Sequence, residues 1–159
     1  MRYLLSFVLA FGAAAQPLYL PAPALTPGVA NRAVTQANIH ETICRAGWTK
    51  TIRPAASYTN RLKLQQMAEL ELAGKPSDYE EDHKISLECG GDPLDPRNLW
   101  PQPWPEARLK DVVETSLKRQ VCSGQITLIA AQKILAGDWT AEYQRIKGRT
   151  VAEALKGKN

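Results

Sequence analysis

Carboxylates, an imidazole and a carboxamide gather in one stretch of the chain, residues 79–104, and in the positions just after it. Asp82 and His83 are adjacent, Asn98 follows near the end of the stretch, and Asp111 comes shortly afterwards. Carboxylate oxygens are the ligands that hard divalent cations such as Mg²⁺ prefer. An imidazole changes its charge near neutral pH, so it can take up or release a proton during a reaction. This combination of residue types suits a metal-assisted hydrolysis.

The pattern around these residues predicts a strand, a turn, a second strand and a helix. Apolar and polar residues alternate from Asp82 to Leu87, which is typical of a strand. Gly90-Gly91 can adopt the positive φ of a turn, and two Asp-Pro pairs follow it in a rigid loop. A return strand is expected to begin at Asn98. A helix over Pro105–Val121 is predicted by its apolar stripe, its N-terminal proline and the basic residues in its last turn.

In order and approximate spacing, Asp82-His83, Gly90-Gly91 and Asn98-Leu99 resemble the motif of the HNH nuclease family, also called the ββα-metal finger. That motif reads Asp-His, a hydrophobic run, a Gly-Gly turn, an Asn-Leu pair and a helix that carries the last ligand. The resemblance covers residues 79–118, about a quarter of the chain. The chain is also similar to a group of small exported bacterial proteins that carry this hairpin.

The resemblance implies a metal-dependent endonuclease that hydrolyses phosphodiester bonds in DNA or RNA. His83 would be the general base and Asp82 would hold the divalent cation. Mg²⁺ suits a carboxylate ligand best, with Mn²⁺, Zn²⁺ or Ni²⁺ as alternatives. Asn98 would hold the loop and orient His83, with contact to the metal as a lesser role.

The chain departs from the family motif in the helix. The family places its last ligands about nine and thirteen residues after the middle asparagine, and those positions here are Ala107 and Asp111. Alanine cannot bind a metal. The metal site is therefore either Asp82 with Asp111, with or without the neighbouring Glu106, or it is impaired. Lys110 is a candidate to contact phosphate in place of the lost ligand.

Basic and aromatic residues near the hairpin are candidates for contacts with nucleic acid. Lys84 and Arg97 could bind phosphates, and Trp104, if exposed, could stack on a base. Trp100 is expected to be buried over the hairpin. A formal net charge of +4 and a pI of about 9.0 also favour an anionic partner, although the excess of positive charge is small and spread along the chain.

A length of 159 residues suits one domain, and a composition of 44% hydrophobic and 23% charged residues permits a packed core. Residues 1–15 have the pattern of a secretory signal peptide, with Arg2 before an apolar run that ends in small residues. Residues 16–30 are rich in proline and are predicted to be a linker. We therefore expect a secreted or periplasmic protein, with no stable membrane insertion after removal of the signal.

Three cysteines occur in the chain, at positions 44, 89 and 122. An exported protein can hold disulfides. Cys44 and Cys122 each lie at the end of a predicted helix, whereas Cys89 lies in the hairpin turn, so we expect a Cys44–Cys122 disulfide. Three free thiols are the alternative. No two cysteines are close enough in the sequence to form a zinc-ligand pair.

The remaining pattern predicts a small, mostly helical α+β domain over residues 31–146, with the hairpin and its helix at the centre. A strand is expected at 48–54, and further helices are expected at 34–44, 57–73, 126–135 and 139–146. Residues 147–159 form a basic tail that is expected to fray.

Two other functions stay open at this point. Because Ala107 replaces a family ligand, the chain is also compatible with a non-catalytic envelope or nucleic-acid-binding module that retains the HNH scaffold. A structural or interaction protein held together by Cys44–Cys122 is the third alternative.

Overall fold

A computed structural model describes residues 21–157, and the predicted signal peptide lies outside them. In this part of the chain six α-helices accompany one two-stranded antiparallel sheet, so the α+β class is confirmed. The strands are β1 (Tyr79–His83) and β2 (Leu99–Pro103). The helices are α1 (Trp48–Ile52), α2 (Ala56–Glu69), α3 (Trp104–Cys122), α4 (Leu128–Ala136), α5 (Trp139–Lys147) and α6 (Val151–Lys156).

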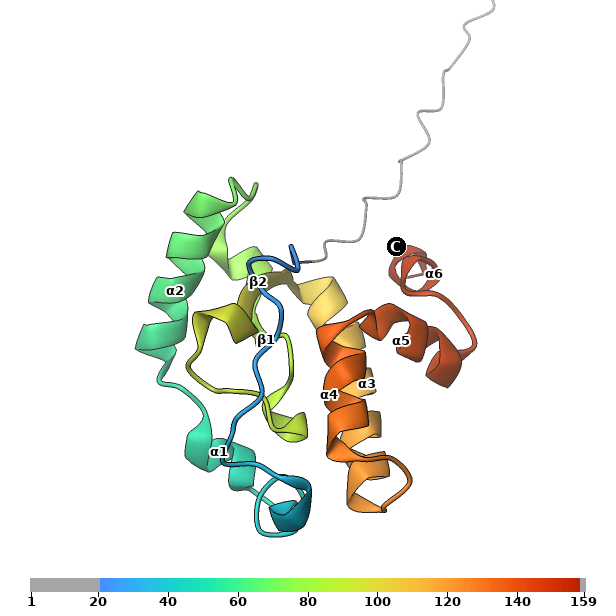
Figure 1. Cartoon of the computed structure of the whole chain (residues 1–159). Helices are drawn as coiled ribbons and strands as arrows, with labels where there is room; N and C mark the ends of the chain where they lie inside the picture. The colour runs from blue at the N-terminus through green and yellow to red at the C-terminus, as the bar shows by residue number, and fades with distance from the viewer. Residues whose placement is uncertain (1–20, 158–159) are drawn as a thin grey trace, which may run out of the picture.

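Helix α3 is the central element of the fold (Figure 1). It begins directly after β2, and Pro105 occupies its first turn, where the missing N–H costs nothing. On one side α3 packs against α4, α5 and α6, and on the other it contacts the β-hairpin, which α2 covers from the opposite side. Its buried apolar residues are Ala107, Leu109, Val113, Leu117 and Val121. Trp139 and Tyr143 of α5 complete this core.

The hairpin pairs Tyr79 with Pro103 at its open end and His83 with Leu99 at its loop end. Each glycine of the Gly-Gly pair in the loop is required for a separate reason. Gly90 has a φ of +72°, which favours glycine, and a Cβ at Gly91 would lie 1.8 Å from the carbonyl oxygen of Ile85. The strand β1 ends at His83, earlier than the alternation through Leu87 predicts.

The N-terminal part of the described chain crosses the loop of the hairpin (Figure 1). The backbone N–H of Gly28 donates to the carbonyl of Arg97 at 3.1 Å, and the N–H of Asp92 donates to the carbonyl of Val29 at 2.7 Å. Residues 21–30, which lie in the predicted linker, are therefore attached to the domain by backbone hydrogen bonds.

Two of the secondary-structure predictions are wrong. Residues 48–54 contain the short helix α1 and not a strand, because no neighbouring strand pairs with them in the described residues and Trp48 packs against the core instead. Residues 34–44 are not a continuous helix. A 3₁₀ turn at Gln36–Asn38 is followed by further turns, and these bury Ile39 and Ile43. In the predicted basic tail, α6 forms and buries Val151 and Ala154.

A disulfide joins Cys44 to Cys122, as predicted, with Cα atoms 5.6 Å apart. Cys89 is a free and buried thiol. Disulfides persist in oxidising compartments, so this bond agrees with the export that the sequence predicts. Within the part of the chain that the structure describes, none of the helices is both long and apolar enough to span a bilayer.

Candidate functional site

The alternation of β1 directs its charged side chains to two faces of the hairpin. Glu80 and Asp82 face α3, since Asp82 pairs with Lys110 of that helix. Glu81 points to the opposite face, where the ammonium of Lys63 in α2 acts on its carboxyl. The hairpin therefore offers one acidic face to each of the two helices that enclose it.

The ammonium of Lys110 lies at the centre of the α3 side. Its side chain is fully buried, and Nζ donates hydrogen bonds to Oδ2 of Asp82 at 2.8 Å, to the backbone oxygen of His83 at 2.7 Å and to Oε1 of Glu114. Three acceptors satisfy the three N–H groups of an ammonium. The position beside the Asp-His pair is therefore occupied by a cation that belongs to the protein.

The partners of Lys110 maintain its charge. Burial disfavours the charged ammonium, but the carboxylates of Asp82 and Glu114 outweigh burial and raise the pKa of Lys110. Burial also raises the pKa of Glu114 to about 8, although the ammonium opposes that rise. The ammonium of Lys110 is therefore held charged by its contacts with Asp82 and Glu114.

His83 is turned into the hairpin loop and is only 5% exposed. Its Nε2 lies 3.2 Å from the carbonyl oxygen of Pro93. A carbonyl oxygen can only accept, so Nε2 carries the proton of this hydrogen bond. Burial lowers the pKa of His83, against the opposing effect of the Pro93 carbonyl. The residue predicted as general base thus holds a proton on Nε2 and directs it to the backbone.

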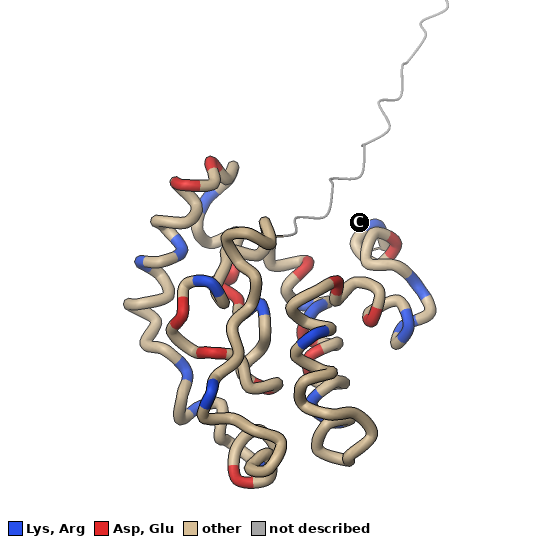
Figure 2. Tube along the Cα trace, viewed as in Figure 1, with Lys and Arg blue, Asp and Glu red and all other residues tan. Residues whose placement is uncertain are grey.

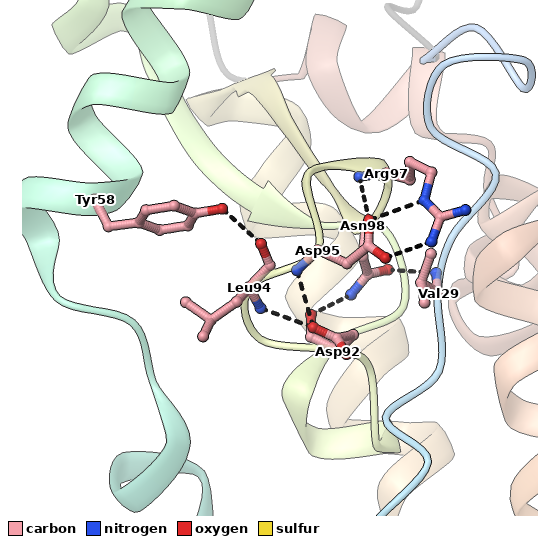
Figure 3. A network of polar contacts seen from close by, with 7 residues as sticks. All are labelled: Val29, Tyr58, Asp92, Leu94, Asp95, Arg97 and Asn98. Atoms are coloured by element: carbon pink, nitrogen blue, oxygen red, sulfur yellow. Dashed lines mark hydrogen bonds and ion pairs between the residues drawn. The ribbon is translucent and has the colours of Figure 1, made fainter.

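Asn98 is fully buried and closes the loop. Its Oδ1 accepts from the backbone N–H groups of Val29 at 3.1 Å and Ile85 at 2.9 Å. Its Nδ2 donates to the carbonyl oxygens of Ile85 at 3.0 Å and Asp92 at 2.8 Å. Figure 3 shows the contacts with Val29 and Asp92. Asn98 therefore joins the N-terminal segment, the chain after β1 and the loop.

The loop is also tied internally and to α2 (Figure 3). Oδ1 of Asp92 accepts from the backbone N–H groups of Leu94 and Asp95, both at 2.9 Å. The hydroxyl of Tyr58 in α2 donates to the carbonyl oxygen of Leu94 at 2.5 Å. Side chains therefore hold the backbone of the loop between the strands from three directions.

The predicted metal ligands do not form a complete metal site. Oδ1 of Asp82 accepts from the backbone N–H of His83 at 2.8 Å and Oδ2 accepts from Lys110, so both oxygens already have partners. Glu106 is buried in the first turn of α3, whereas Asp111 is exposed. In the described part of the chain, no three His, Cys, Asp or Glu side chains are grouped so that they could hold a metal ion. These residues fit a divalent cation poorly.

Glu80, Asp82 and Asp111 nevertheless form an acidic group beside Lys110. Burial raises the pKa of Glu80 to about 7, and the charges of Asp82 and Asp111 add to this rise. Burial and the charge of Asp82 also raise the pKa of Asp111. Such carboxyls repel one another when ionised, so the group favours either a proton or a neighbouring cation.

The three residues predicted to contact phosphate differ in accessibility. Lys84 is buried, and its Nζ donates to the carbonyl oxygen of Gly137 at 3.0 Å. Lys110 is buried in its ion pair with Asp82. The side chain of Arg97 is 66% exposed and pairs with Asp95 at 2.6 Å. The two lysines hold the fold together, and Arg97 is the one of the three that a ligand can reach.

Two features of α3 were not predicted from the sequence. Lys110 and Glu114 are four residues apart on the stripe that carries Val113, and a charged pair at this spacing on an apolar stripe is the signal of a buried ion pair. At the start of the helix, the guanidinium of Arg108 lies 5.9 Å from the ring centre of Trp104, whose side chain remains 38% exposed. An aromatic residue followed by an arginine four positions later predicts this contact.

Comparisons with known proteins do not assign a function to this chain. No protein-family model matches the chain, and no curated protein or solved structure matches it either.

Proposed function

We propose that this protein is a nucleic-acid-binding module that uses an HNH-type hairpin and helix as its scaffold and acts without a divalent cation. The observation that carries this proposal is the position of Lys110, whose ammonium neutralises Asp82 where a nuclease of this type would need its metal. An ammonium supplies positive charge but no open coordination position, so it cannot activate a bound water. The function expected of this arrangement is binding and not hydrolysis.

The continuity of the hairpin and helix supports the choice of scaffold. The strand β1, the loop, the strand β2 and α3 follow one another from Tyr79 to Cys122. This is the order of elements that the HNH resemblance implies. Asn98 and Gly91 keep the loop closed through buried hydrogen bonds and a close backbone approach. These contacts make the loop a preformed platform that needs no ion for its shape.

The start of α3 is the part of this scaffold best suited to contact a base. The indole of Trp104 is partly exposed, and the guanidinium of Arg108 lies over it. An exposed indole can stack on any base, and such stacking contributes about 1–3 kcal/mol. An adjacent arginine adds a phosphate contact and holds the ring by a cation–π interaction.

Fluorescence anisotropy with labelled single-stranded DNA and RNA tests the proposal. The wild-type chain is expected to bind equally well with Mg²⁺ and with EDTA, and its affinity is expected to fall with salt. Trp104→Ala is expected to weaken binding about tenfold. The control is Ile129→Ala on α4, because Ile129 is also an exposed apolar residue and should be neutral. Failure of the wild type to bind either nucleic acid at low salt would refute the proposal.

Metal-dependent hydrolysis is the second candidate, because burial and the charge of Asp82 raise the pKa of both Glu80 and Asp111 and a cation would relieve this repulsion. A magnesium ion can use one or two carboxylates and keep several waters. Incubation of plasmid DNA and RNA with the purified protein and Mg²⁺ or Mn²⁺ separates the candidates. Cleavage that EDTA abolishes and that Asp82→Asn removes would replace the binding function by the nuclease.

A further inference from the structure

We infer that the hollow between the C-terminal half of α3 and the end of α5 is an anion site that holds phosphate groups. The hollow has a volume of about 740 Å³. It lies on a different part of α3 from the Lys110 ion pair. The identification of its ligand as the phosphate backbone of a nucleic acid rests on the proposed function.

The lining of the hollow is basic. Arg119 of α3 and Arg145 and Lys147 of α5 contribute three cations from two elements, and none of the described residues that line the hollow is acidic. All three cationic residues are exposed. The end of α5 and the turn after it, residues 145–149, carry three basic residues and no acidic one (Figure 2). This part of the surface is therefore more basic than the small net charge of the whole chain suggests.

Neutral hydrogen-bond donors complete the lining. Ser116 and Gln120 come from α3, and Ser123 and Gln125 come from the turn that follows it. Hydroxyl and carboxamide groups can donate to phosphate oxygens in addition to arginine and lysine. Val112 and Ile146 also line the hollow, and the cations and neutral donors around them suit an oxyanion better than a metal.

Glu142 orients one of the cations without closing the site. Nε of Arg145 donates to Oε2 of Glu142 at 2.7 Å, and Nη2 donates to Oε1 at 2.6 Å. A guanidinium has five N–H groups, so this bidentate pair leaves both N–H groups of Nη1 for a ligand. Glu142 is buried behind the arginine, whose side chain is 61% exposed. Glu142 thus holds Arg145 in place for an anion, but it also neutralises one positive charge of the lining.

Arg119, at the edge of the hollow, lies on the same face of α3 as the exposed indole. At the helical repeat, Trp104, Arg108 and Arg119 fall within about 60° of one another, and the first and last are about 22 Å apart along the axis. At a rise of about 3.4 Å per nucleotide this distance spans several nucleotides of one strand. A single strand that stacks a base on Trp104 can therefore place a later phosphate in the hollow.

A pair of double variants tests the inference. Arg119→Gln with Lys147→Gln removes two charges from the hollow, and Arg61→Gln with Lys50→Gln removes two charges from exposed positions on α2 and α1. For a labelled single-stranded oligonucleotide of about 20 bases, the hollow variant is expected to lose at least tenfold in affinity and to have a shallower salt dependence, by about 1.4 in the logarithmic slope. The control variant is expected to lose less than threefold. Equal losses in the two variants would overturn the inference.

A titration with inorganic pyrophosphate separates this inference from the proposed function. Followed by ¹⁵N–¹H NMR of the wild-type chain, it is expected to shift the backbone amides of Ser116, Gln120 and Gln125 and not those of Lys50 and Arg61. If these shifts occur while no oligonucleotide binds, the anion site stands and the nucleic-acid function falls. If oligonucleotide binds but neither it nor pyrophosphate shifts these amides, the inference about the hollow falls and the proposed function stands.

Discussion

Nζ of Lys110 lies 2.8 Å from Oδ2 of Asp82, which joins the middle of α3 to the end of β1 across 28 positions of sequence. The same ammonium reaches the backbone of His83 and the carboxyl of Glu114. One side chain therefore fixes the position of the hairpin on the central helix and also neutralises the carboxylate beside the histidine.

Replacing Lys110 by methionine keeps most of the volume of the side chain but removes its charge. Asp82 and the buried Glu114 then lose their common partner, and we expect the free energy of unfolding to fall by about 3–5 kcal/mol in urea denaturation. Lys118→Met is the matched control on the same helix. Lys118 pairs with Glu88 at 3.5 Å and is partly exposed, so its loss should cost about 0–1 kcal/mol. Similar losses in the two variants would mean that Lys110 is not the structural centre of the site.

Divalent cations are expected to leave the stability of the wild-type protein unchanged. A ligand that binds the native state raises the melting temperature, and the ammonium of Lys110 already supplies the charge that such a cation would bring to Asp82. Thermal unfolding with EDTA and with millimolar Mn²⁺ measures this. In Lys110→Ala, Asp82 and Glu114 lack their cation, so Mn²⁺ should raise the melting temperature of that variant. A rise of several degrees in the wild type would contradict the assignment.

Asn98→Ala removes four hydrogen bonds from the loop, two of them buried and two partly buried. The backbone groups that it leaves unsatisfied are buried or partly buried, so we expect a loss of at least about 3 kcal/mol in the free energy of unfolding. Hydrogen exchange should show loss of protection at the amides of Val29 and Ile85. Asn38→Ala is the control, because the side chain of Asn38 also hydrogen-bonds to backbone but at an exposed turn. It should cost about 1 kcal/mol.

The carboxyl of Glu81 makes stability depend on pH. Burial raises its pKa from 4.5 to about 8, with Lys63 opposing the rise and Asp82 adding to it. A pKa that is higher in the folded state contributes stability that is complete below the unfolded value of about 4.5 and is lost as the pH rises through about 8. Glu81→Gln removes this dependence. We therefore expect the variant to gain stability relative to the wild type between about pH 5 and pH 8, measured by urea denaturation at each pH. A difference that stays constant over this range would show that Glu81 titrates normally.

Helix α3 and the return strand were predictable because their signals are local, whereas the first strand was expected over 82–87 and lies at 79–83. The apolar stripe, Pro105 and the basic last turn place the helix within one residue of its observed ends, and Gly90-Gly91 marks the turn. The structure of residues 48–54 was not predictable, because a run of β-branched residues forms a strand only where another strand pairs with it. At this position the described chain offers none, and the residues form α1 instead.

The candidate site was predictable in its location but not in its chemistry. Asp82, His83 and Asn98 all lie at the loop end of the hairpin. The side chain of Asn98 holds the loop, as predicted, but its hydrogen bonds go to Val29, Ile85 and Asp92 and not to His83. The role of Lys110 was not predictable, since a lysine can direct its ammonium to solvent or inward, and the direction depends on Asp82, which is distant in the sequence. The spacing of Lys110 and Glu114 on an apolar stripe was the available clue.

The order in which the cysteines are synthesised bears on how the crosslink forms. Cys44 is made first, Cys89 second and its correct partner Cys122 last. Until Cys122 has been made, Cys89 is the sole thiol with which Cys44 can combine within the chain. Packing of the loop against α3 and α4 withdraws Cys89 from solvent, and burial raises the pKa of its thiol to about 12, which suppresses the reactive thiolate. Docking of the loop on these helices before oxidation therefore protects the chain against mispairing of Cys44 with Cys89.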